Sequence, residues 1–443
     1  MTDVKQLPWE EWIKERDNPQ DAWRKPEAMD DVVVIDASYG NYAGLFASSI
    51  LAEFGAFTIK IEPPGGDIAR KMTPYGMLVK DTGLAYLVEG RNKYHITLNL
   101  NTEEGREIFK ELASYADVVI ETARPGEFDA MGIGYRQLKE LNPKLIYCAI
   151  HTYGQFGPEA EKNWKKPDYD LIDQARSGIM AITGEPDDPD VPDEVKVPTR
   201  EGNWMGWYSG GCWAAFGIIT ALIWRMKSGK GQFIDVAPPE AEAKFCDYHI
   251  QWYHQSGKLR GRVGAYDSAV FPYTFVRTKD GVCFISGFSD VNWAHLCKIM
   301  ENPELKDKFP TIFDRLNPEN QPKIHHAIEE WSQNLTSKEL EEKVMKANLA
   351  PDAVGVVATA KVNRPSETLE EEHWWVRGTF QKVKDPYYGE FVVQAPAANK
   401  MTETPARLKW PLRPVGADNL FVYKKFLGYG PSVLKKLKEK GVI

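Results

Sequence analysis

The sequence predicts an α/β protein with a parallel sheet, because short β-branched runs alternate with helical segments in its N-terminal part. The clearest unit is a strand at 32–36, a glycine turn, a helix at 45–54 and a second strand at 57–62. Strand, helix and strand in that order give parallel strands joined by a right-handed crossover. The chain has 443 residues, more than one hydrophobic core usually holds, which predicts two domains.

Further strands are expected at 94–99, 118–121 and 145–150, with a helix opened by Thr102 and another at 135–141. These segments complete four strand–helix repeats. The turn after the first strand lacks G-x-G-x-x-G, and Glu62 at the end of the second strand is followed by Pro-Pro-Gly-Gly, which does not suit a ribose-binding acid. A nicotinamide site is therefore not favoured.

The segment 197–236 contains a loop, a glycine turn, an apolar helix and a strand. Almost every residue from 212 to 226 is apolar, which predicts a helix that is buried on most sides. The run is too short for a typical membrane span. We expect the loop at 200–208, at the entrance of this helix, to belong to an active site.

Composition excludes several classes of function. The formal net charge of −8 disfavours nucleic acid as a partner. Five cysteines without a C-x-x-C pair predict neither a zinc site nor disulfides, and no metal is expected. The acidic start MTDVKQLPWEEWIKERD has no apolar signal region. We expect a cytoplasmic protein that does not bind membranes.

Seven segments resemble class III CoA-transferases, which include formyl-CoA, carnitine, bile-acid and benzylsuccinate CoA-transferases and the related methylacyl-CoA racemases. In chain order they are VVVIDASYGNYAG, FGAFTIKIEPPGGD, GRNKYHITLNL, VVIETARPG, NPKLIYCAIHTYGQFGP, PDYDLIDQARSGIM and SGKGQFIDVA. The resemblance covers residues 30–443. It implies a Rossmann-like large domain built from both chain ends, a smaller α+β domain and an interlocked dimer. It also implies acyl-CoA as a substrate and no covalently bound cofactor.

On this basis the chain divides into five parts. They are an N-terminal arm at 1–29, the first part of the large domain at 30–236, a connector at 237–266, the small domain at 267–385 and a return to the large domain at 386–443.

Moving CoA between two acids requires a carboxylate that attacks the thioester, because it is ionised at neutral pH without a base. In the resembling family an Asp supplies it. Counting back from Gly229 without a gap, that position is Trp207 here, and the nearby acid Glu201 is the alternative nucleophile. Tyr169 stands where the racemases carry a catalytic His, which disfavours that branch. His151 follows a strand, but the sequence shows no partner for it.

The resemblance also implies residues that contact CoA. The candidates are Ala43, Arg70, Arg91, Lys93, Leu98 and Arg124. The cations among them could hold phosphates. Three positions depart from the formyl-CoA transferase pattern and weaken a nucleotide site: Thr122, Ala123 and Ala130.

Three interpretations of Trp207 follow. The chain is a non-catalytic subunit that pairs with a homologous Asp-bearing subunit, or an active homodimer that uses Glu201, or a CoA-binding or structural protein without chemistry. The aromatic side chains Trp204, Trp207, Tyr208 and Trp213 suit either a pocket for an aromatic acid such as benzylsuccinate or a packed interface. The first interpretation is favoured, with succinyl-CoA as an example of the CoA donor.

Overall fold

The computed structural model describes residues 8–163, 166–186, 197–259, 261–267, 269–394 and 398–443. The chain divides into two compact units. Unit 1 comprises residues 1–179, 200–255 and 372–443, and unit 2 comprises 180–199 and 256–371. Both ends of the chain therefore belong to unit 1.

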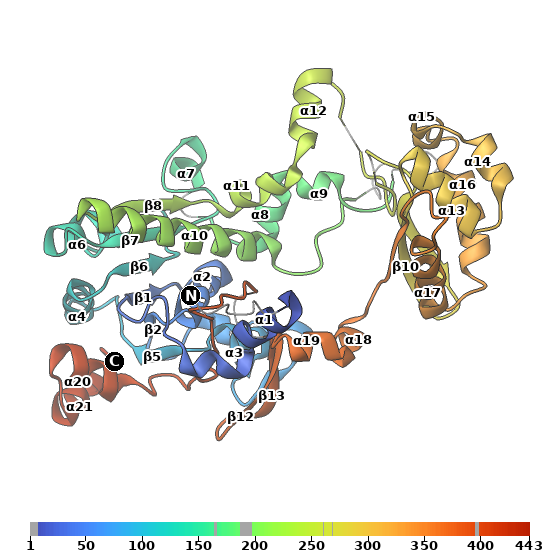
Figure 1. Cartoon of the computed structure of the whole chain (residues 1–443). Helices are drawn as coiled ribbons and strands as arrows, with labels where there is room; N and C mark the ends of the chain where they lie inside the picture. The colour runs from blue at the N-terminus through green and yellow to red at the C-terminus, as the bar shows by residue number, and fades with distance from the viewer. Residues whose placement is uncertain (1–7, 164–165, 187–196, 260, 268, 395–397) are drawn as a thin grey trace. The chain divides into compact units, whose positions relative to one another are not determined.

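Unit 1 is built on a six-stranded sheet of order β5-β2-β1-β6-β7-β8 (Figure 1). The strands are β1 Val33–Ala37, β2 Phe57–Glu62, β5 Lys93–Thr97, β6 Val118–Glu121, β7 Ile146–Ile150 and β8 Phe233–Val236. Every neighbouring pair is parallel. This confirms the predicted α/β class. The chain builds outward from β1 in one direction and then in the other, so the β1/β6 boundary is the switch point where ligands bind in open α/β sheets.

Helices cover both faces of this sheet because its buried strands alternate their apolar side chains between two cores. Val34 and Ile120 face the core that contains α2 and α10, whereas Ile35 and Val119 face the core that contains α4, α20 and α21. The helices of unit 1 are α1 Trp9–Arg16, α2 Tyr42–Glu53, α3 Leu84–Glu89, α4 Glu103–Ser114, α5 Glu127–Ala130, α6 Tyr135–Leu141, α7 Pro158–Asn163, α8 Asp170–Ser177, α10 Met205–Ser228, α11 Pro238–Ala243, α12 Tyr248–Ser256, α19 Glu372–Val376, α20 Asn419–Leu427 and α21 Pro431–Glu439. Short 3-10 turns lie at Pro19–Arg24, Ile68–Lys71, Pro74–Gly76 and Lys244–Cys246.

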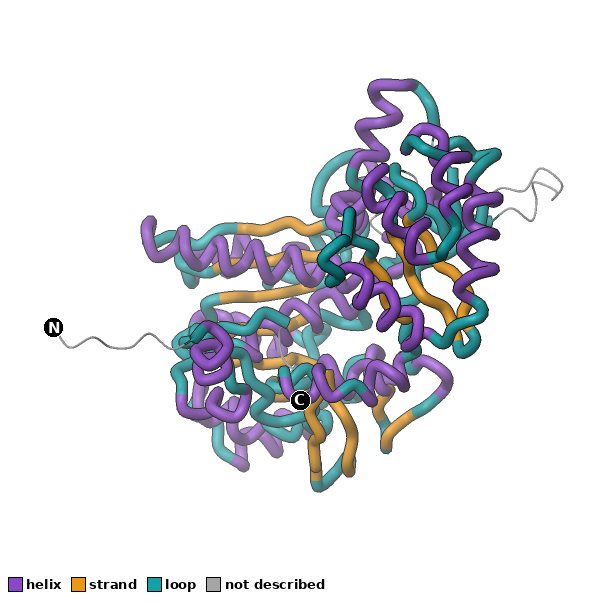
Figure 2. The backbone as a smooth tube through the Cα atoms, turned by 45° about the vertical axis from the view of Figure 1, so that its right-hand side comes forward, coloured by secondary structure: helices purple, strands orange, loops and turns teal. Residues whose placement is uncertain are grey.

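Two small antiparallel hairpins complete unit 1. One joins β3 Leu78–Val79 to β4 Thr82–Gly83, and the other joins β12 Phe380–Asp385 to β13 Gly389–Gln394. The second hairpin is visible as a two-stranded ribbon in Figure 2.

Unit 2 has its own core around a three-stranded antiparallel sheet of order β11-β10-β9. Strands β9 Tyr273–Thr278 and β10 Gly281–Ser286 form the hairpin that the Lys279-Asp280-Gly281 turn predicts, and β11 is Ala358–Lys361. Its helices are α13 Asp290–Ile299, α14 Pro303–Lys308, α15 Ile312–Leu316, α16 Gln321–Ser332, α17 Ser337–Asn348 and α18 Pro365–Glu370, and α9 Ile179–Ile182 lies where the chain enters this unit.

Helix α10 differs from its prediction in length. The predicted glycine turn at Gly210 and Gly211 is part of the helix, which begins at Met205. A Cβ atom on Gly211 would come within 2.7 Å of the Ala43 carbonyl oxygen, and one on Gly210 within 2.8 Å of the Pro238 ring. These glycines therefore allow α10 to pack closely on α2 and α11 rather than to turn the chain.

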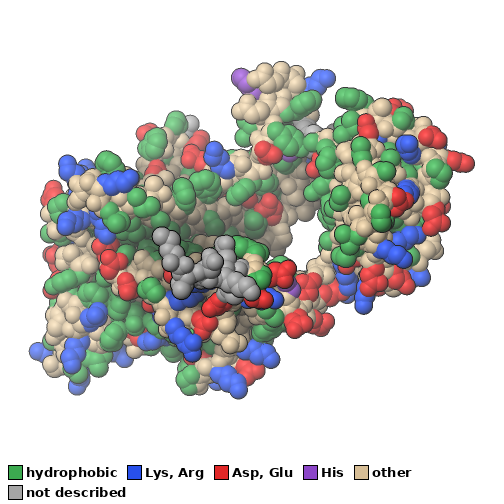
Figure 3. All heavy atoms as spheres, in the orientation of Figure 1, with side chains coloured by type: hydrophobic (Ala, Val, Ile, Leu, Met, Phe, Trp, Pro, Cys, Tyr) green, Lys and Arg blue, Asp and Glu red, His purple; other side chains and the backbone are tan. Residues whose placement is uncertain are grey.

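The prediction that α10 is buried on most sides is wrong. One side, with Ala214 and Ile218, is buried, whereas Phe216, Trp224 and Met226 on the other side are 63%, 54% and 86% exposed. Hydrophobic side chains gather on the face where α10 lies in Figure 3. Among the described helices α10 alone is long and apolar enough to span a bilayer, and 56% of its most apolar window is buried within the fold.

Candidate active site

Trp207 lies in the first turn of α10 and is one of the largest fully buried side chains, with 1% exposure. Its backbone N–H donates to Asp170 Oδ1 at 3.1 Å, and its indole Nε1 donates to Asp168 Oδ1 at 3.4 Å. The indole stacks near the ring of Tyr42, with ring centroids 6.0 Å apart, and Trp204 packs against both rings. The side chain is therefore held from several directions.

Three carboxylates surround the start of α8 beside this indole. Asp168 accepts hydrogen bonds from Asn41 Nδ2 at 3.0 Å and from Thr152 Oγ1 at 2.9 Å. Asp173 lies 2.7 Å from the same hydroxyl, and Asp170 accepts from Trp207. Burial raises the pKa of all three, and with the nearby Asp168 charge it raises the pKa of Asp173 to about 9. Asp173 is therefore protonated at neutral pH.

Sequence reasoning missed this cluster, although its spacing was visible. Asp170 and Asp173 are three residues apart and share one face of α8, and Asp168 directly precedes that helix in the segment PDYDLIDQ. The cluster is polar but shielded, because Asp170 and Asp173 are both buried.

His151 follows β7 and is buried beside this cluster. Its Nδ1 accepts from the Tyr153 backbone N–H at 3.3 Å, while Nε2 has no hydrogen-bond partner among the described residues. Burial lowers the pKa of His151, and the Asp168 charge offsets part of that shift. The structure thus places His151 within electrostatic reach of Asp168 but shows no hydrogen bond between them among the described residues, and His151 is neutral at pH 7.

Glu201 lies in the loop before α10 and is partly exposed. Its backbone N–H donates to Gln174 Oε1 at 3.0 Å, and Gln174 Nε2 donates to Asp170 Oδ2 at 2.8 Å. Burial raises the pKa of Glu201, and burial with the Glu201 charge raises the pKa of Glu242 to about 7. Gln174 thus connects Glu201 to the carboxylate that anchors Trp207.

The structure contradicts the phosphate-binding role predicted for Arg70. Its side chain is 3% exposed and forms a bidentate ion pair with Glu62, with Nε–Oε2 and Nη2–Oε1 distances of 2.6 and 2.7 Å. Arg91 is likewise buried, between Glu53 and Glu89, and it pairs with both. An anion would have to displace these carboxylates to reach either guanidinium.

Lys93 is fully buried in the same layer, where its Nζ donates to the Leu45 carbonyl at 2.6 Å and lies 3.4 Å from Asp36. Burial lowers the pKa of Lys93 to about 7. Ala43 and Leu98 are also buried, in the two cores of the sheet. None of these three residues offers a surface to CoA, which corrects their predicted role.

Arg124 differs from the other candidates because it is exposed, directly after β6 at the switch point of the sheet. Thr122, two residues earlier, accepts a hydrogen bond from the Tyr39 backbone N–H at 3.1 Å, and Ala130 is exposed at the end of α5. Of the six predicted CoA contacts, Arg124 alone has a side chain that a ligand can reach.

Comparison with known proteins places the chain in a family. The model of CoA-transferase family III matches residues 29–419, so the chain belongs to that family and is a CoA-transferase polypeptide, of an enzyme class whose substrates are CoA thioesters. It is 32% identical to the succinyl-CoA–D-citramalate CoA-transferase of Chloroflexus aurantiacus, over 95% of this chain and 99% of that protein. The beta subunit of succinyl-CoA–L-malate CoA-transferase from the same organism is 30% identical, over 93% and 96%.

Among solved structures, a CAIB/BAIF family protein from Brucella suis is similar, with a TM-score of 0.75 and 26% identity. The match covers 91% of this chain and 100% of that one. These findings confirm the family and the fold class that the sequence motifs predicted.

Proposed function

We propose that this chain is the non-catalytic subunit of a two-subunit class III CoA-transferase. The observation that supports it most strongly is the buried Trp207 at the position where the family resemblance places the nucleophilic Asp. An indole cannot form the anhydride and thioester that carry CoA between acids. Because Trp207 is anchored by Asp168, by Asp170 and by neighbouring rings, it fills that position firmly.

The partner supplies the missing carboxylate. It attacks the acyl-CoA thioester carbonyl and expels CoA thiolate, which leaves a mixed anhydride. The thiolate then attacks the anhydride at the enzyme's acyl carbon, forms an enzyme–CoA thioester and releases the first acid. The acceptor acid repeats these two steps in reverse and leaves with CoA, so the nucleophile is regenerated and no proton is consumed.

Exposed apolar side chains support a stable protein partner. Besides Phe216, Trp224 and Met226 on α10, helix α12 exposes Ile250 and Trp252 and contains no buried residue. Apolar surface of this kind marks an interaction site. A subunit in the related L-malate enzyme of Chloroflexus aurantiacus shows that the family includes enzymes with distinct subunits.

The CoA donor of the proposed complex is succinyl-CoA, in keeping with the names of the relatives, and the acceptor is a carboxylic acid. The aromatic side chains predicted to form a pocket give little support for an aromatic acceptor such as benzylsuccinate. Trp204 and Trp207 pack against Tyr42, and the Tyr208 hydroxyl lies 3.5 Å from Glu89. These rings contribute to packing inside unit 1, and of the set Trp213 alone is exposed.

An active homodimer that uses Glu201 is the second candidate. It rests on the partial exposure of Glu201 and on its backbone N–H, which donates to Gln174 and so connects the residue to Asp170, the carboxylate that anchors Trp207. Burial raises the pKa of Glu201, which reduces the ionised fraction that such a nucleophile needs.

The experiment that separates these candidates traps the enzyme–CoA thioester. The chain alone and the chain co-expressed with its Asp-bearing homologue are incubated with succinyl-CoA, treated with borohydride or hydroxylamine, and mapped by mass spectrometry. We expect activity and a modified Asp in a soluble 1:1 complex, on the partner only, with an inactive and aggregation-prone lone chain. A thioester at Glu201, lost in Glu201→Gln, would instead establish the homodimeric enzyme.

A further inference from the structure

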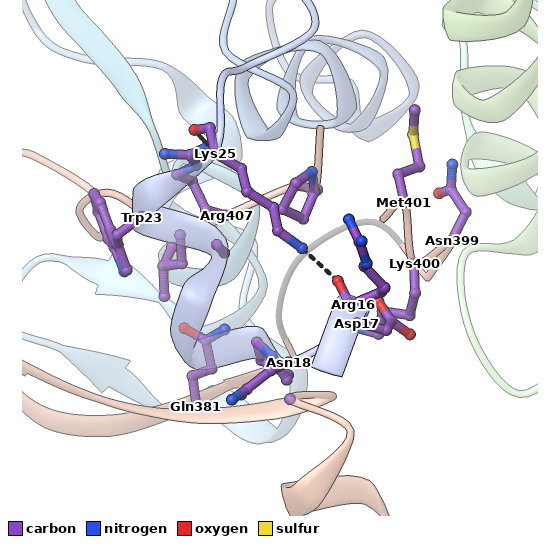
Figure 4. Close-up of a pocket in the computed structure, with 16 residues that line it drawn as sticks. Arg16, Asp17, Asn18, Trp23, Lys25, Gln381, Asn399, Lys400, Met401 and Arg407 are labelled. Carbon is purple, nitrogen blue, oxygen red and sulfur yellow. Dashed lines mark hydrogen bonds between the residues drawn. The ribbon is translucent and has the colours of Figure 1, made fainter. Parts of the chain in front are cut away.

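The N-terminal arm and the segment that returns to unit 1 line a cavity of about 40 Å³, here called the arm cavity (Figure 4). Its charged lining residues are Arg16, Asp17, Lys25, Lys400 and Arg407. Four cations thus face one carboxylate. None of the residues that line the arm cavity belongs to the group around Trp207 and Asp168, so the arm cavity is separate from the candidate active site.

Three of these cations have no carboxylate partner in the part of the chain that the structure describes. The Lys25 ammonium donates to the Arg16 backbone carbonyl, a neutral acceptor, as the dashed line in Figure 4 shows. No ion pair involves Arg16, Lys25 or Lys400 among the described residues. Burial lowers the pKa of Lys400, the Asp17 charge offsets part of this shift, and the Arg377 charge adds to it. The positive charge of the arm cavity is therefore poorly balanced.

Arg407 is the buried member of the set, with 7% exposure. Its Nη2 donates to the carbonyls of Lys25 and Pro26 at 2.7 and 3.1 Å, which ties the return segment to the arm. Its Nε has no hydrogen-bond partner among the described residues. The Glu27 carboxylate is 3.8 Å from that atom and only 3.1 Å from Lys409, which competes for it. The buried Nε–H group of Arg407 can therefore donate a hydrogen bond to a bound ligand.

The walls of the arm cavity also offer apolar contact. The Arg407 guanidinium lies 5.7 Å from the centroid of the Trp23 ring, and Trp23 is 60% exposed. Met401 and Leu408 line the same space. Cations combined with an aromatic and aliphatic wall suit a small organic anion, because charge-assisted hydrogen bonds hold its head group while its body covers apolar surface.

We propose that the arm cavity binds the phosphate or carboxylate group of a small organic anion, held by Arg16, Lys400 and Arg407. Neutralising these charges stabilises the arm against the return segment, because Arg407 joins both. The arm cavity is therefore a ligand site additional to the CoA-transferase chemistry. Phosphate and carboxylate groups share this recognition chemistry, and the choice of probe distinguishes them.

Isothermal titration of the full-length chain, or of the complex in which it purifies, tests this with inorganic pyrophosphate and with succinate at low ionic strength. We expect one saturable site that weakens as salt is added. Lys400→Ala should weaken binding roughly tenfold, the loss expected for one charge-assisted hydrogen bond. Arg16→Ala, at an exposed side chain, should weaken it similarly, whereas Lys424→Ala, an exposed lysine on α20, should not change it.

The tighter of the two probes identifies the head group as phosphate or carboxylate. Failure of both probes to saturate a site at millimolar concentration would overturn the proposal. Unchanged binding in a correctly folded Lys400→Ala variant, or displacement of the probe by CoA in that variant, would assign the binding elsewhere and overturn it too. Circular dichroism of each variant verifies the fold.

Discussion

Two groups of cations in unit 1 differ in what surrounds them. Arg70 and Arg91 are buried and each lies within 2.8 Å of a carboxylate oxygen, whereas Arg16 and Lys400 line the arm cavity without an ion pair among the described residues. Burying an unpaired charge is costly, so cations inside the fold are paired with carboxylates. Cations at an accessible cavity remain available to a ligand. Charge and sequence position do not separate the two groups, but pairing does.

The largest expected effect comes from breaking a buried pair. Arg70→Ala leaves the Glu62 carboxylate buried at 0% exposure, with the His95 ring and the Asp67 backbone N–H as its remaining hydrogen-bond partners among the described residues. The free energy of unfolding should fall by about 3–5 kcal/mol, as for other buried pairs that lose one partner. Chemical denaturation of the purified protein measures it.

The matched control is Lys110→Ala, which breaks the exposed Lys110–Glu107 pair on α4. Its effect should stay below about 1 kcal/mol, because surface ion pairs contribute little. Equal losses in the two variants would show that the buried layer does not depend on its pairing.

A second prediction concerns pH. Burial lowers the pKa of Lys93 to about 7 in the folded chain, whereas an unfolded lysine titrates near 10.4. Between these two pH values the unfolded chain binds more protons at Lys93 than the folded chain does. The contribution of Lys93 to the free energy of unfolding therefore rises with pH, and this contribution is lost as the pH falls toward 7. From pH 7.5 to 9.5 the rise contributed by this group is at most about 2.7 kcal/mol.

Lys93→Met should remove this contribution, because it keeps an apolar chain of similar length without a titrating group. Denaturation midpoints of both proteins at pH 7.5 and 9.5 give the comparison. A pH dependence that survives unchanged in the variant would mean that Lys93 keeps its charge inside the fold.

A third prediction extends the argument to acids, which cluster without cations around Trp207. Trp207→Asp adds a carboxylate next to Asp168, Asp170 and Asp173, whose pKa values burial already raises. The new group should therefore be largely protonated at pH 7 and a poor nucleophile. We expect turnover at least roughly tenfold below that of the Asp-bearing partner, rising with pH.

The departures at Thr122, Ala123 and Ala130 act in the same direction, because weaker binding of the remote nucleotide lowers the chemical step. Initial rates of CoA transfer across pH 6–9, compared with Trp207→Asn, measure the effect. Turnover of Trp207→Asp equal to that of the partner, and independent of pH, would show that the acid cluster imposes no such cost.

The parts of the fold that depend on local pattern could be predicted from the sequence. The β-branched run at Val33–Ala37 and the helix that follows it form the predicted unit, since burial on both faces demands continuous apolar residues. The role of Gly211 could not be predicted. A turn and a close helix contact both require glycine. The structure shows that Gly211 serves the contact, because a Cβ atom at this position would lie 2.7 Å from the Ala43 carbonyl oxygen.

The site was predictable in part. Trp207 and Glu201 were singled out from the sequence, but the hydrogen bonds that connect their backbone N–H groups through Asp170 and Gln174 were not predicted. The CoA-binding predictions for the buried cations failed because the carboxylates that pair with them come from other helices and strands. Arg91 pairs with Glu53 of α2, 38 residues away, and no local pattern marks such a pair. Likewise, Arg407 donates a hydrogen bond to the Lys25 carbonyl, 382 residues away in the sequence, and no local pattern predicts this contact.

The smallest expected effect has the opposite sign to the first. In Lys400→Ala, measured without added anion, one of four crowded cations is removed and no carboxylate loses its partner. Relief of like-charge repulsion should leave stability unchanged or raise it, by up to about 0.5 kcal/mol, the usual range for substitutions away from buried contacts. Adding pyrophosphate or succinate, whichever binds, should stabilise the wild-type chain more than the variant, since a ligand stabilises the state that binds it. Thermal unfolding with and without the anion measures both terms. A loss comparable to that of Arg70→Ala would place Lys400 among the structural cations, and the contrast between the two groups would then fail.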